Sequence, residues 1–399
     1  MHHQFIEAAL RSPFYQKKLN GISLDTWADI PFTEKHELRD ADSFSLLGTA
    51  VADIASYHET SGTTGKPTSS WYSFRDVENE SKLVSESHLA LRRGDLLLNR
   101  LTFTVAVASF IGLWATQYTK CGHISLAKSD VSTPVRVLDV IKRTQPTVLM
   151  EIPFQLEILA GVKQRLGFQT PTSLRALLAA GELVSPSRRK WLQSLWKVPV
   201  YNLFGSTETG GLVTSCHQGH FHLDNPTVLF EVVDDDGQPL GFEQRGQLVL
   251  STLRQGMPLL RFATHDIVEL KPAEICTCGN SHPVLIHYGR QEDVTRIGGH
   301  SWTLYDLQEI VYNLPRIPMA WKFVLNKESV AFLYQPFVEC ESQSEQDVLS
   351  AELSAKLQVP VAVSCTEIVP QASLLQQSNT TKFKYVSEVT DEEFADKAI

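Results

Sequence analysis

The chain has 399 residues, of which 43% are hydrophobic and 20% are charged. This composition excludes a disordered chain, a collagen-like repeat and a small disulfide scaffold, and the length predicts roughly two or three domains. The formal net charge is -9, and no stretch interleaves basic with aromatic residues, so nucleic acid is not expected as a partner.

The amino-terminal segment predicts a short amphipathic helix and not a signal peptide, because Glu7 and Arg11 interrupt the apolar run that a signal peptide requires. Residues 101–119 carry no charge and are nearly long enough to span a bilayer, yet six of these positions are Thr, Ser or Gln. We therefore expect a buried strand and a buried helix here, with the break between them near Gly112. We also expect a cytoplasmic protein with no membrane segment.

Strands and helices alternate through the first part of the chain. The β-rich runs at 147–154 and 198–204 are separated by longer helical stretches, which predicts a layered α/β core. After Leu229 the pattern changes to short strands with turn signals, among them the hairpin signal Asp236-Gly237. The pattern predicts a β-rich subdomain followed by a last compact α+β segment.

The most informative segment is HETSGTTGKPTSS at residues 58–70, which is rich in glycine and hydroxyl side chains. Its backbone N–H groups can turn inward together around a polyphosphate, and Lys66 adds a cation. It is not a Walker loop, since Thr60 and Pro67 stand where that motif needs Gly and Ser or Thr. An exposed linker is the alternative that this segment alone leaves open.

Four elements in this order resemble the adenylate-forming superfamily of acyl-CoA synthetases and adenylation domains. They are S-G-T-T-G-K-P, Y-N-L-F-G-S-T-E at 201–208, R-F-A-T-H-D at 261–266 and G-R-Q-E-D at 289–293. Within the superfamily the chain is most similar to the phenylacetate CoA ligase branch, almost end to end. The additional matches to that branch are SPFYQKKL, IPFTEKHELRD, Gly181 with Glu182, and CTCGN.

This resemblance implies an α/β fold with two domains. Residues 1–289 would form a large N-terminal adenylation domain of layered α/β sheets, in which residues 229–289 are the β-rich subdomain. Residues 290–399 would form a small, mobile α+β C-terminal domain. The hinge acid of the family falls on Glu292, and hinge motions of this kind pivot on a few residues.

The resemblance also implies the chemistry, which is ATP-dependent activation of an aryl or arylacetic acid as an acyl adenylate. Transfer to a thiol follows, with coenzyme A as the default acceptor. Phe204 would stack on adenine, Thr207 would reach the α-phosphate, and Asp266 would bind the ribose hydroxyls, while Glu208 would hold Mg²⁺. The remaining nucleotide-binding residues implied are Ser61, Gly62, Thr63, Thr64, Gly65, Lys66, Gly181, Glu182, Gly205 and Arg290.

A late lysine serves the adenylation step in the resembled family. In SNTTKFKYV, Lys382 corresponds to that lysine and Lys384 is the second candidate. The alternative is a lysine that is simply exposed to solvent in the tail, as most lysines are. Two positions depart from the family pattern, because His265 and Thr381 stand where glycine is common. The catalytic residues expected are Lys382, Glu208, Thr207 and Lys66.

The cysteine pattern favours reduced thiols over a disulfide-dependent fold, because six cysteines are sparse in a chain of this length. Cys276 and Cys278 lie about sixty residues after Cys216 and a group of histidines. Three thiolates and one imidazole form a closed tetrahedral Zn²⁺ set, so we expect a structural zinc. The resemblance to zinc-binding members of the same branch implies Cys216, His222, Cys276 and Cys278 as its ligands, with His220 as the second choice for the imidazole. Unrelated buried cysteines are the alternative.

Several partners stay open at this level. The resemblance places Phe103, Phe110, Trp114 and Phe154 in the wall of the acid pocket, although core packing is commoner for such residues. The acceptor could be coenzyme A, a carrier-protein thiol or an amine, and a homodimer is one assembly to consider. A non-catalytic relative that binds nucleotide or acyl adenylate is the competing function.

Overall fold

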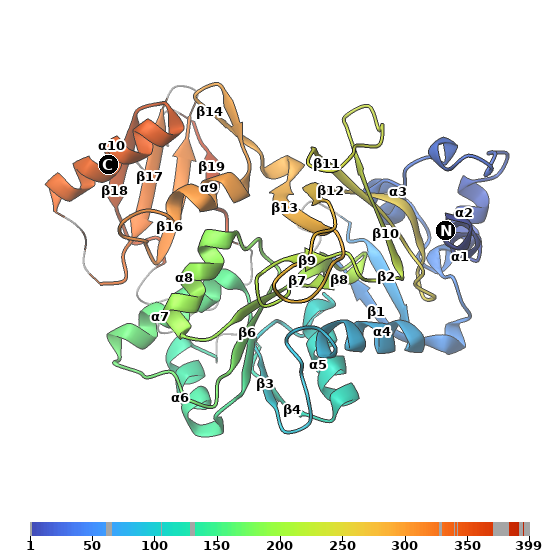
Figure 1. The fold of residues 1–399 in the computed structure, drawn as a ribbon, viewed down its shortest axis with the longest axis horizontal. Coiled ribbons are helices and arrows are strands. Elements are labelled where there is room, and N and C mark those ends of the chain that lie inside the picture. The colour runs from blue at the N-terminus through green and yellow to red at the C-terminus, as the bar shows by residue number, and fades with distance from the viewer. Residues whose placement is uncertain are drawn as a thin grey trace.

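A computed structural model gives the fold (Figure 1). It describes residues 2–60, 66–104, 106–127, 132–326, 329–338, 340, 342–369, 383–390 and 394. The expected amino-terminal helix is two helices, α1 (His2–Ala9) and α2 (Pro13–Lys18), because Ser12 and Pro13 start a new one. Short 3₁₀ turns lie at Trp27–Asp29, Ser43–Leu46, Val51–Asp53 and Gln291–Asp293, and α3 spans Lys35–Asp40.

A six-stranded sheet of order β4-β3-β5-β6-β7-β8 forms the centre, with only its edge strand β8 antiparallel to its neighbour. Helices α4 and α5 pack on one face, while α6, α7 and α8 pack on the other (Figure 1). The strands are β3 (Leu96–Asn99), β4 (Gly122–Ser125), β5 (Val148–Glu151), β6 (Ala176–Ala180), β7 (Val200–Ser206) and β8 (Gly210–Thr214). The helices are α4 (Phe74–Ser85), α5 (Ala108–Thr119), α6 (Pro134–Thr144), α7 (Pro153–Arg165) and α8 (Pro186–Trp196).

Alternate side chains of this sheet enter two separate cores. Leu97 and Met150 pack with α5, whereas Leu98 and Leu149 pack with α6 and α7. Near-continuous apolar strands are typical of a parallel sheet covered on both faces. The layered α/β core expected from the sequence is therefore confirmed.

The expectation of a break near Gly112 is wrong. Helix α5 continues through this residue, and the preceding strand already ends at Asn99. A Cβ at Gly112 would lie 2.7 Å from Met150 Sδ, so the glycine lets the helix approach the sheet closely and does not interrupt it.

A five-stranded sheet of order β10-β11-β12-β13-β9 forms the β-rich part. Its strands are β9 (Phe221–His222), β10 (Val228–Val233), β11 (Arg245–Thr252), β12 (Leu259–Lys271) and β13 (Val284–Arg290). The signal at Asp236-Gly237 does fall in the β10–β11 connection, where Gly237 has a φ of +77°. The connection is longer than a tight hairpin. Val233 pairs with Pro239 just beyond the turn, and β11 begins only at Arg245.

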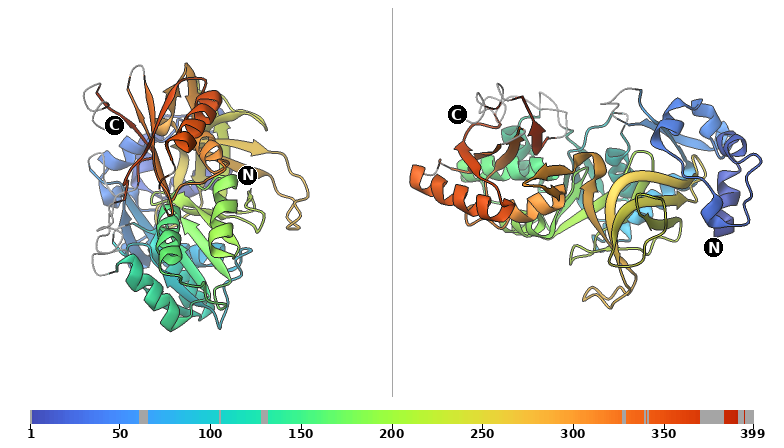
Figure 2. Two further views of the ribbon diagram at one scale, coloured as in Figure 1. Left: turned by 90° about the vertical axis from the view of Figure 1, so that its left-hand side faces the viewer. Right: turned by 90° about the horizontal axis from the view of Figure 1, so that it is seen from above.

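The C-terminal part is a four-stranded sheet of order β18-β17-β16-β19, together with two helices and the small hairpin β14-β15. Its elements are β14 (Thr295–Ile297), β15 (His300–Trp302), α9 (Leu304–Val311), β16 (Ala320–Leu325), β17 (Val330–Gln335), α10 (Gln343–Leu357), β18 (Val361–Cys365) and β19 (Val386–Glu388). It lies against α7 and α8, at the opposite end of the molecule from α1 and α2 (Figures 1 and 2). The domain boundary near residue 290 stays a prediction.

The expectation of reduced thiols is wrong at one pair. Cys340 and Cys365 form a disulfide with a Cα–Cα distance of 5.9 Å. The sequence spacing gave no sign of this pair because β17 and the loop after it bring Cys340 beside the end of β18. Within the described ranges, none of the helices combines the length and apolarity that a membrane crossing requires.

Candidate functional site

The turn between β7 and β8 carries three of the predicted site residues. Gly205 has a φ of +159°, and a Cβ there would overlap the carbonyl oxygen of Gly210, so this close approach admits only glycine. The turn is tied by Ser206 N, which donates to Thr209 Oγ1 at 3.0 Å. This local geometry places Thr207 and Glu208 at the end of the central sheet.

Asp266 and Arg290 are brought side by side by the β12–β13 pairing, in which they are direct partners. His287 Nε2 lies 3.3 Å from Asp266 Oδ1, and its ring centroid lies 4.8 Å from that of Phe204. Burial raises the pKa of Asp266, but the hydrogen bond and charge of His287, together with Arg290, outweigh burial and hold the pKa below its ordinary value. Residues far apart in sequence thus form one group around an ionised carboxylate.

The departure from the family pattern at His265 has a conformational explanation. Its φ is +61°, the left-handed region in which glycine is usual and histidine is among the better-tolerated side chains. His265 Nε2 lies 3.1 Å from Glu34 Oε2, and Nδ1 lies 3.1 Å from Gln247 Nε2. These contacts hold the imidazole beside Asp266 at an irregularity of β12, where the register with β11 shifts between Gln247 and Val249.

Glu208 is buried and faces a lysine that sequence reasoning did not assign to the site. The Glu208 side chain is 4% exposed, and its Oε1 lies 2.8 Å from Lys35 Nζ. Lys35 belongs to the IPFTEKHELRD run. The match of this run to the family signature was the only feature of the sequence that could have indicated this lysine. Burial lowers the pKa of Arg290, but the carboxylates of Asp266 and Glu292, and then that of Glu208, outweigh burial and raise it above its ordinary value.

A second set of missed residues supports the turn from behind. Arg254 Nη1 donates to the carbonyl oxygen of Glu208 at 2.7 Å, and its guanidinium stacks 3.8 Å from the ring centroid of Tyr72. The Tyr72 hydroxyl donates to the carbonyl oxygen of Thr207 at 3.2 Å. Neither residue belongs to a motif, so no pattern in the sequence could have indicated them.

The glycine- and hydroxyl-rich run is only partly described. Ser61, Gly62, Thr63, Thr64 and Gly65 lie outside the described residues. The flanking strands β1 (Ile54–Glu59) and β2 (Ser69–Ser73) pair antiparallel, and Thr60 N donates to the Thr68 carbonyl oxygen at 3.1 Å. The run is therefore joined to a hydrogen-bonded stem, and Lys66 is exposed at its end.

Glu182 lies at the interface between the large and C-terminal domains. Its Oε2 lies 3.3 Å from both Arg188 Nη2 and the Tyr385 hydroxyl, and it accepts from Phe154 N at 3.2 Å. The preceding Gly181 has a φ of +87°, which turns the chain at the end of β6. The structure thus gives this pair a role in joining the domains, and its nucleotide contact stays a prediction.

The predicted hinge and late lysine are described to different extents. Glu292 is exposed and its Oε1 lies 3.2 Å from Arg290 Nη1. Lys382 lies outside the described residues, whereas Lys384 is exposed. Phe383, the neighbour of both, stacks on Phe154 with ring centroids 4.2 Å apart.

The four aromatic residues expected in the acid pocket separate into two groups. Phe110 contacts both Phe103 and Trp114, with centroids 5.3 and 6.2 Å apart, and His58 joins them at 4.8 Å from Phe110. Phe154 belongs to the core on the other face of the sheet. Only the first group is therefore placed to form one wall.

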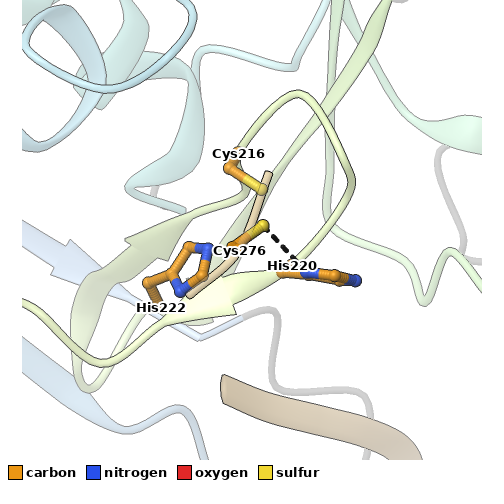
Figure 3. Close-up of side chains that lie close together, drawn as sticks. All are labelled: Cys216, His220, His222 and Cys276. Carbon is orange, nitrogen blue, oxygen red and sulfur yellow. Dashed lines mark hydrogen bonds between the residues drawn. The ribbon is translucent and has the colours of Figure 1, made fainter. Parts of the chain in front are cut away.

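The Cys/His cluster does assemble, with one difference from the expected set. Cys216, His220, His222 and Cys276 point toward one another (Figure 3), and their donor atoms all lie within 4.8 Å of each other. Cys276 Sγ lies 3.4 Å from His220 Nδ1, and Cys278 Sγ lies 3.3 Å from His222 Nε2. Donors bound to a tetrahedral zinc at about 2.0–2.3 Å are about 3.3–3.8 Å apart, so the donor set fits this metal, with five residues available for four positions.

Comparison with known proteins identifies relatives of this chain in sequence and in structure. The family model described as AMP-binding enzyme matches residues 23–255. Phenylacetate-coenzyme A ligase of Thermus thermophilus is 28% identical over 369 residues, covering 86% of this chain and 81% of that protein. The crystal structure of 2-hydroxyisobutyryl-CoA ligase in the postadenylation state with 2-HIB-AMP has a TM-score of 0.85 at 18% identity, covering 99% of this chain and 90% of that one.

A second structure of 2-hydroxyisobutyryl-CoA ligase, with 2-HIB-AMP and CoA in the thioesterification state, has a TM-score of 0.68 at 18% identity. It covers 98% of this chain and 90% of that one. At nearly equal coverage, the TM-score is therefore higher with the postadenylation structure.

Proposed function

The chain belongs to the AMP-binding enzyme family, and from this premise we propose that it is an ATP-dependent acid–thiol ligase. The observation that carries the proposal is the convergence of Phe204, Glu208, Asp266 and Arg290 at one end of the central sheet. These are the positions that the family resemblance assigns to adenine, metal, ribose and phosphate. The name of the Thermus relative supports the same reaction class.

The reaction proposed has two steps. An oxygen of the substrate carboxylate attacks the α-phosphorus of ATP, and the bond to the β-phosphate breaks with release of pyrophosphate. A thiolate then attacks the acyl carbon, and the bond to AMP breaks. The protein supplies positioning and charge, with Asp266 accepting from the ribose hydroxyls while Lys66 and Arg290 face the phosphates.

Glu208 fits a magnesium ligand, because it is a buried carboxylate, and the ion would compete with the Lys35 ammonium for it. Mg²⁺ prefers one or two carboxylates and completes its shell with phosphate oxygens and water. When bound, the ion would neutralise charge on the phosphates. Thr207 is held next to it by the turn that Gly205 permits.

For the acid we propose an aromatic carboxylate, supported by the Phe103, Phe110 and Trp114 group and by the phenylacetate-named relative. Coenzyme A is the proposed acceptor, with a carrier-protein thiol or an amine as alternatives. A cytoplasmic location and a homodimer belong to the same proposal. They are supported only by the resemblance.

The test is carboxylate-dependent exchange of pyrophosphate into ATP, measured over a panel of benzoates, arylacetates and heteroaryl acids. We expect exchange with at least one aromatic acid, and a thioester when coenzyme A is added. ATP binding without exchange across the panel would favour a nucleotide-binding relative that is not an enzyme. No ATP binding at all would contradict both.

We further propose that the Cys/His cluster holds one structural zinc. We expect about one zinc per chain by elemental analysis, because four of its five sulfur and nitrogen donors close a tetrahedral shell with no open position. Replacing Cys276 and Cys278 together by Ser leaves only three donors and should lose the metal and lower the melting temperature. Cys121→Ser should do neither, since Cys121 lies outside the cluster. Zinc well below one per chain in the unaltered protein would exclude the site.

A further inference from the structure

A buried ion pair lies between the large domain and the C-terminal domain. Arg188, whose side chain is fully buried, donates from Nε and Nη2 to the two carboxylate oxygens of Glu157 at 3.1 and 2.9 Å. Arg188 Nη1 also donates to the Leu183 carbonyl oxygen at 3.0 Å. Both charged residues belong to helices of the large domain, α7 and α8.

Two phenols from the C-terminal domain complete this pair. The Tyr385 hydroxyl accepts from Arg188 Nη2 at 2.6 Å, and the Tyr312 hydroxyl donates to Glu157 Oε1 at 2.7 Å. Trp321 Nε1 in turn donates to the Tyr312 hydroxyl at 3.2 Å. Buried charges are costly unless every partner is present, so this group is fully satisfied only in the domain arrangement seen here.

Tyr385 also reaches the nucleotide side of the interface. Its hydroxyl donates to Glu182 Oε2 at 3.3 Å, and Glu182 follows Gly181 in the family motif. Burial raises the pKa of Tyr385 well above its ordinary value, although Arg188 acts in the opposite direction, so the hydroxyl keeps the proton that it donates. Two residues earlier, Phe383 stacks on Phe154, whose backbone N also donates to Glu182.

We propose that Tyr385 is a positioning residue for adenylation, because its hydroxyl docks the C-terminal domain on Arg188 and Glu182 of the large domain. The inference rests on the proposed function and on the place of Tyr385 three residues after Lys382. It assigns Glu182 to the docking interface in addition to the nucleotide motif. Losing the phenol hydroxyl should therefore impair the first half-reaction and spare the second.

The experiment compares Tyr385→Phe with Tyr15→Phe. The control also removes a buried phenol hydroxyl, which accepts from Leu260 N at 2.9 Å, and both of these residues belong to the large domain. We expect Tyr385→Phe to lower kcat for pyrophosphate exchange by roughly 10- to 100-fold, the range for hydrogen bonds to charged groups. The KM for ATP should change by less than about twofold, because uniform nucleotide binding is retained.

Thiolysis of the synthetic acyl adenylate by coenzyme A provides the second readout, with the acid that is most active in the panel. Its rate should be unchanged or higher in Tyr385→Phe, since a loosened dock does not hinder a rotated arrangement. Equal losses in both half-reactions, or a profile matching Tyr15→Phe, would overturn the positioning role. Absence of exchange in the unaltered protein would instead overturn the function.

A second variant keeps the test valid if Tyr385→Phe folds poorly. Tyr312→Phe removes the hydroxyl that bonds to the other carboxylate of the group, Glu157. It should lower the ratio of exchange to thiolysis in the same direction. Small-angle scattering should show a larger radius of gyration for either variant, and an unchanged radius with an unchanged ratio in both would contradict domain docking.

Discussion

Arg188→Met is expected to lower the free energy of unfolding by about 3–5 kcal/mol, the cost of removing one partner from a buried ion pair. The methionine keeps most of the side-chain length but leaves Glu157 and Glu182 without their cation. Glu157 is 1% exposed and Glu182 is 8% exposed, so water cannot replace the guanidinium. The measurement is the melting temperature and unfolding enthalpy by calorimetry.

The matched control is the double variant Arg188→Met with Glu157→Met, in which both charges of the pair are absent. Replacing a buried ion pair by apolar residues of similar volume is often neutral, so the double variant should recover a large part of the lost stability. If the single variant lost less than about 1 kcal/mol, the value for an exposed pair, then Arg188 would have to be hydrated and the interface open.

Local patterns carried much of the fold and of the site. The apolar runs that became β5 and β7 predicted a layered α/β core, and all of β5 and the first five residues of β7 are buried. Asp266 and Arg290 could be assigned because each lies in a motif of its own, and the β12–β13 register then makes them partners. Even the exception at His265 is local, since one φ angle explains it.

Contacts between elements that are distant in sequence could not be predicted from local patterns. Glu157 and Arg188 lie in α7 and α8, whereas Tyr312 directly follows α9 and Tyr385 directly precedes β19. Their charges are compatible with burial only because the tertiary structure brings them together. The same holds for the Cys340–Cys365 pair and for Lys35, whose contact with Glu208 spans most of the large domain's sequence.

Lys382→Ala is expected to reduce acid-dependent pyrophosphate exchange by at least about 100-fold, the usual effect of removing one group that stabilises a developing charge. Thiolysis of a preformed adenylate should be spared, because that step releases AMP and needs no contact with pyrophosphate. Lys384→Ala is the matched control, since it removes an exposed lysine two residues away. Rapid-quench measurement of each half-reaction separates the two variants.

The position of Phe383 helps to interpret the comparison of Lys382→Ala with Lys384→Ala. Because Phe383 stacks on Phe154 and Tyr385 is buried beside Arg188, the chain after Lys382 is fixed against the large domain. Lys384 lies between these two anchored rings and is exposed. Retained exchange in Lys382→Ala together with its loss in Lys384→Ala would assign the adenylation role to Lys384, the second candidate.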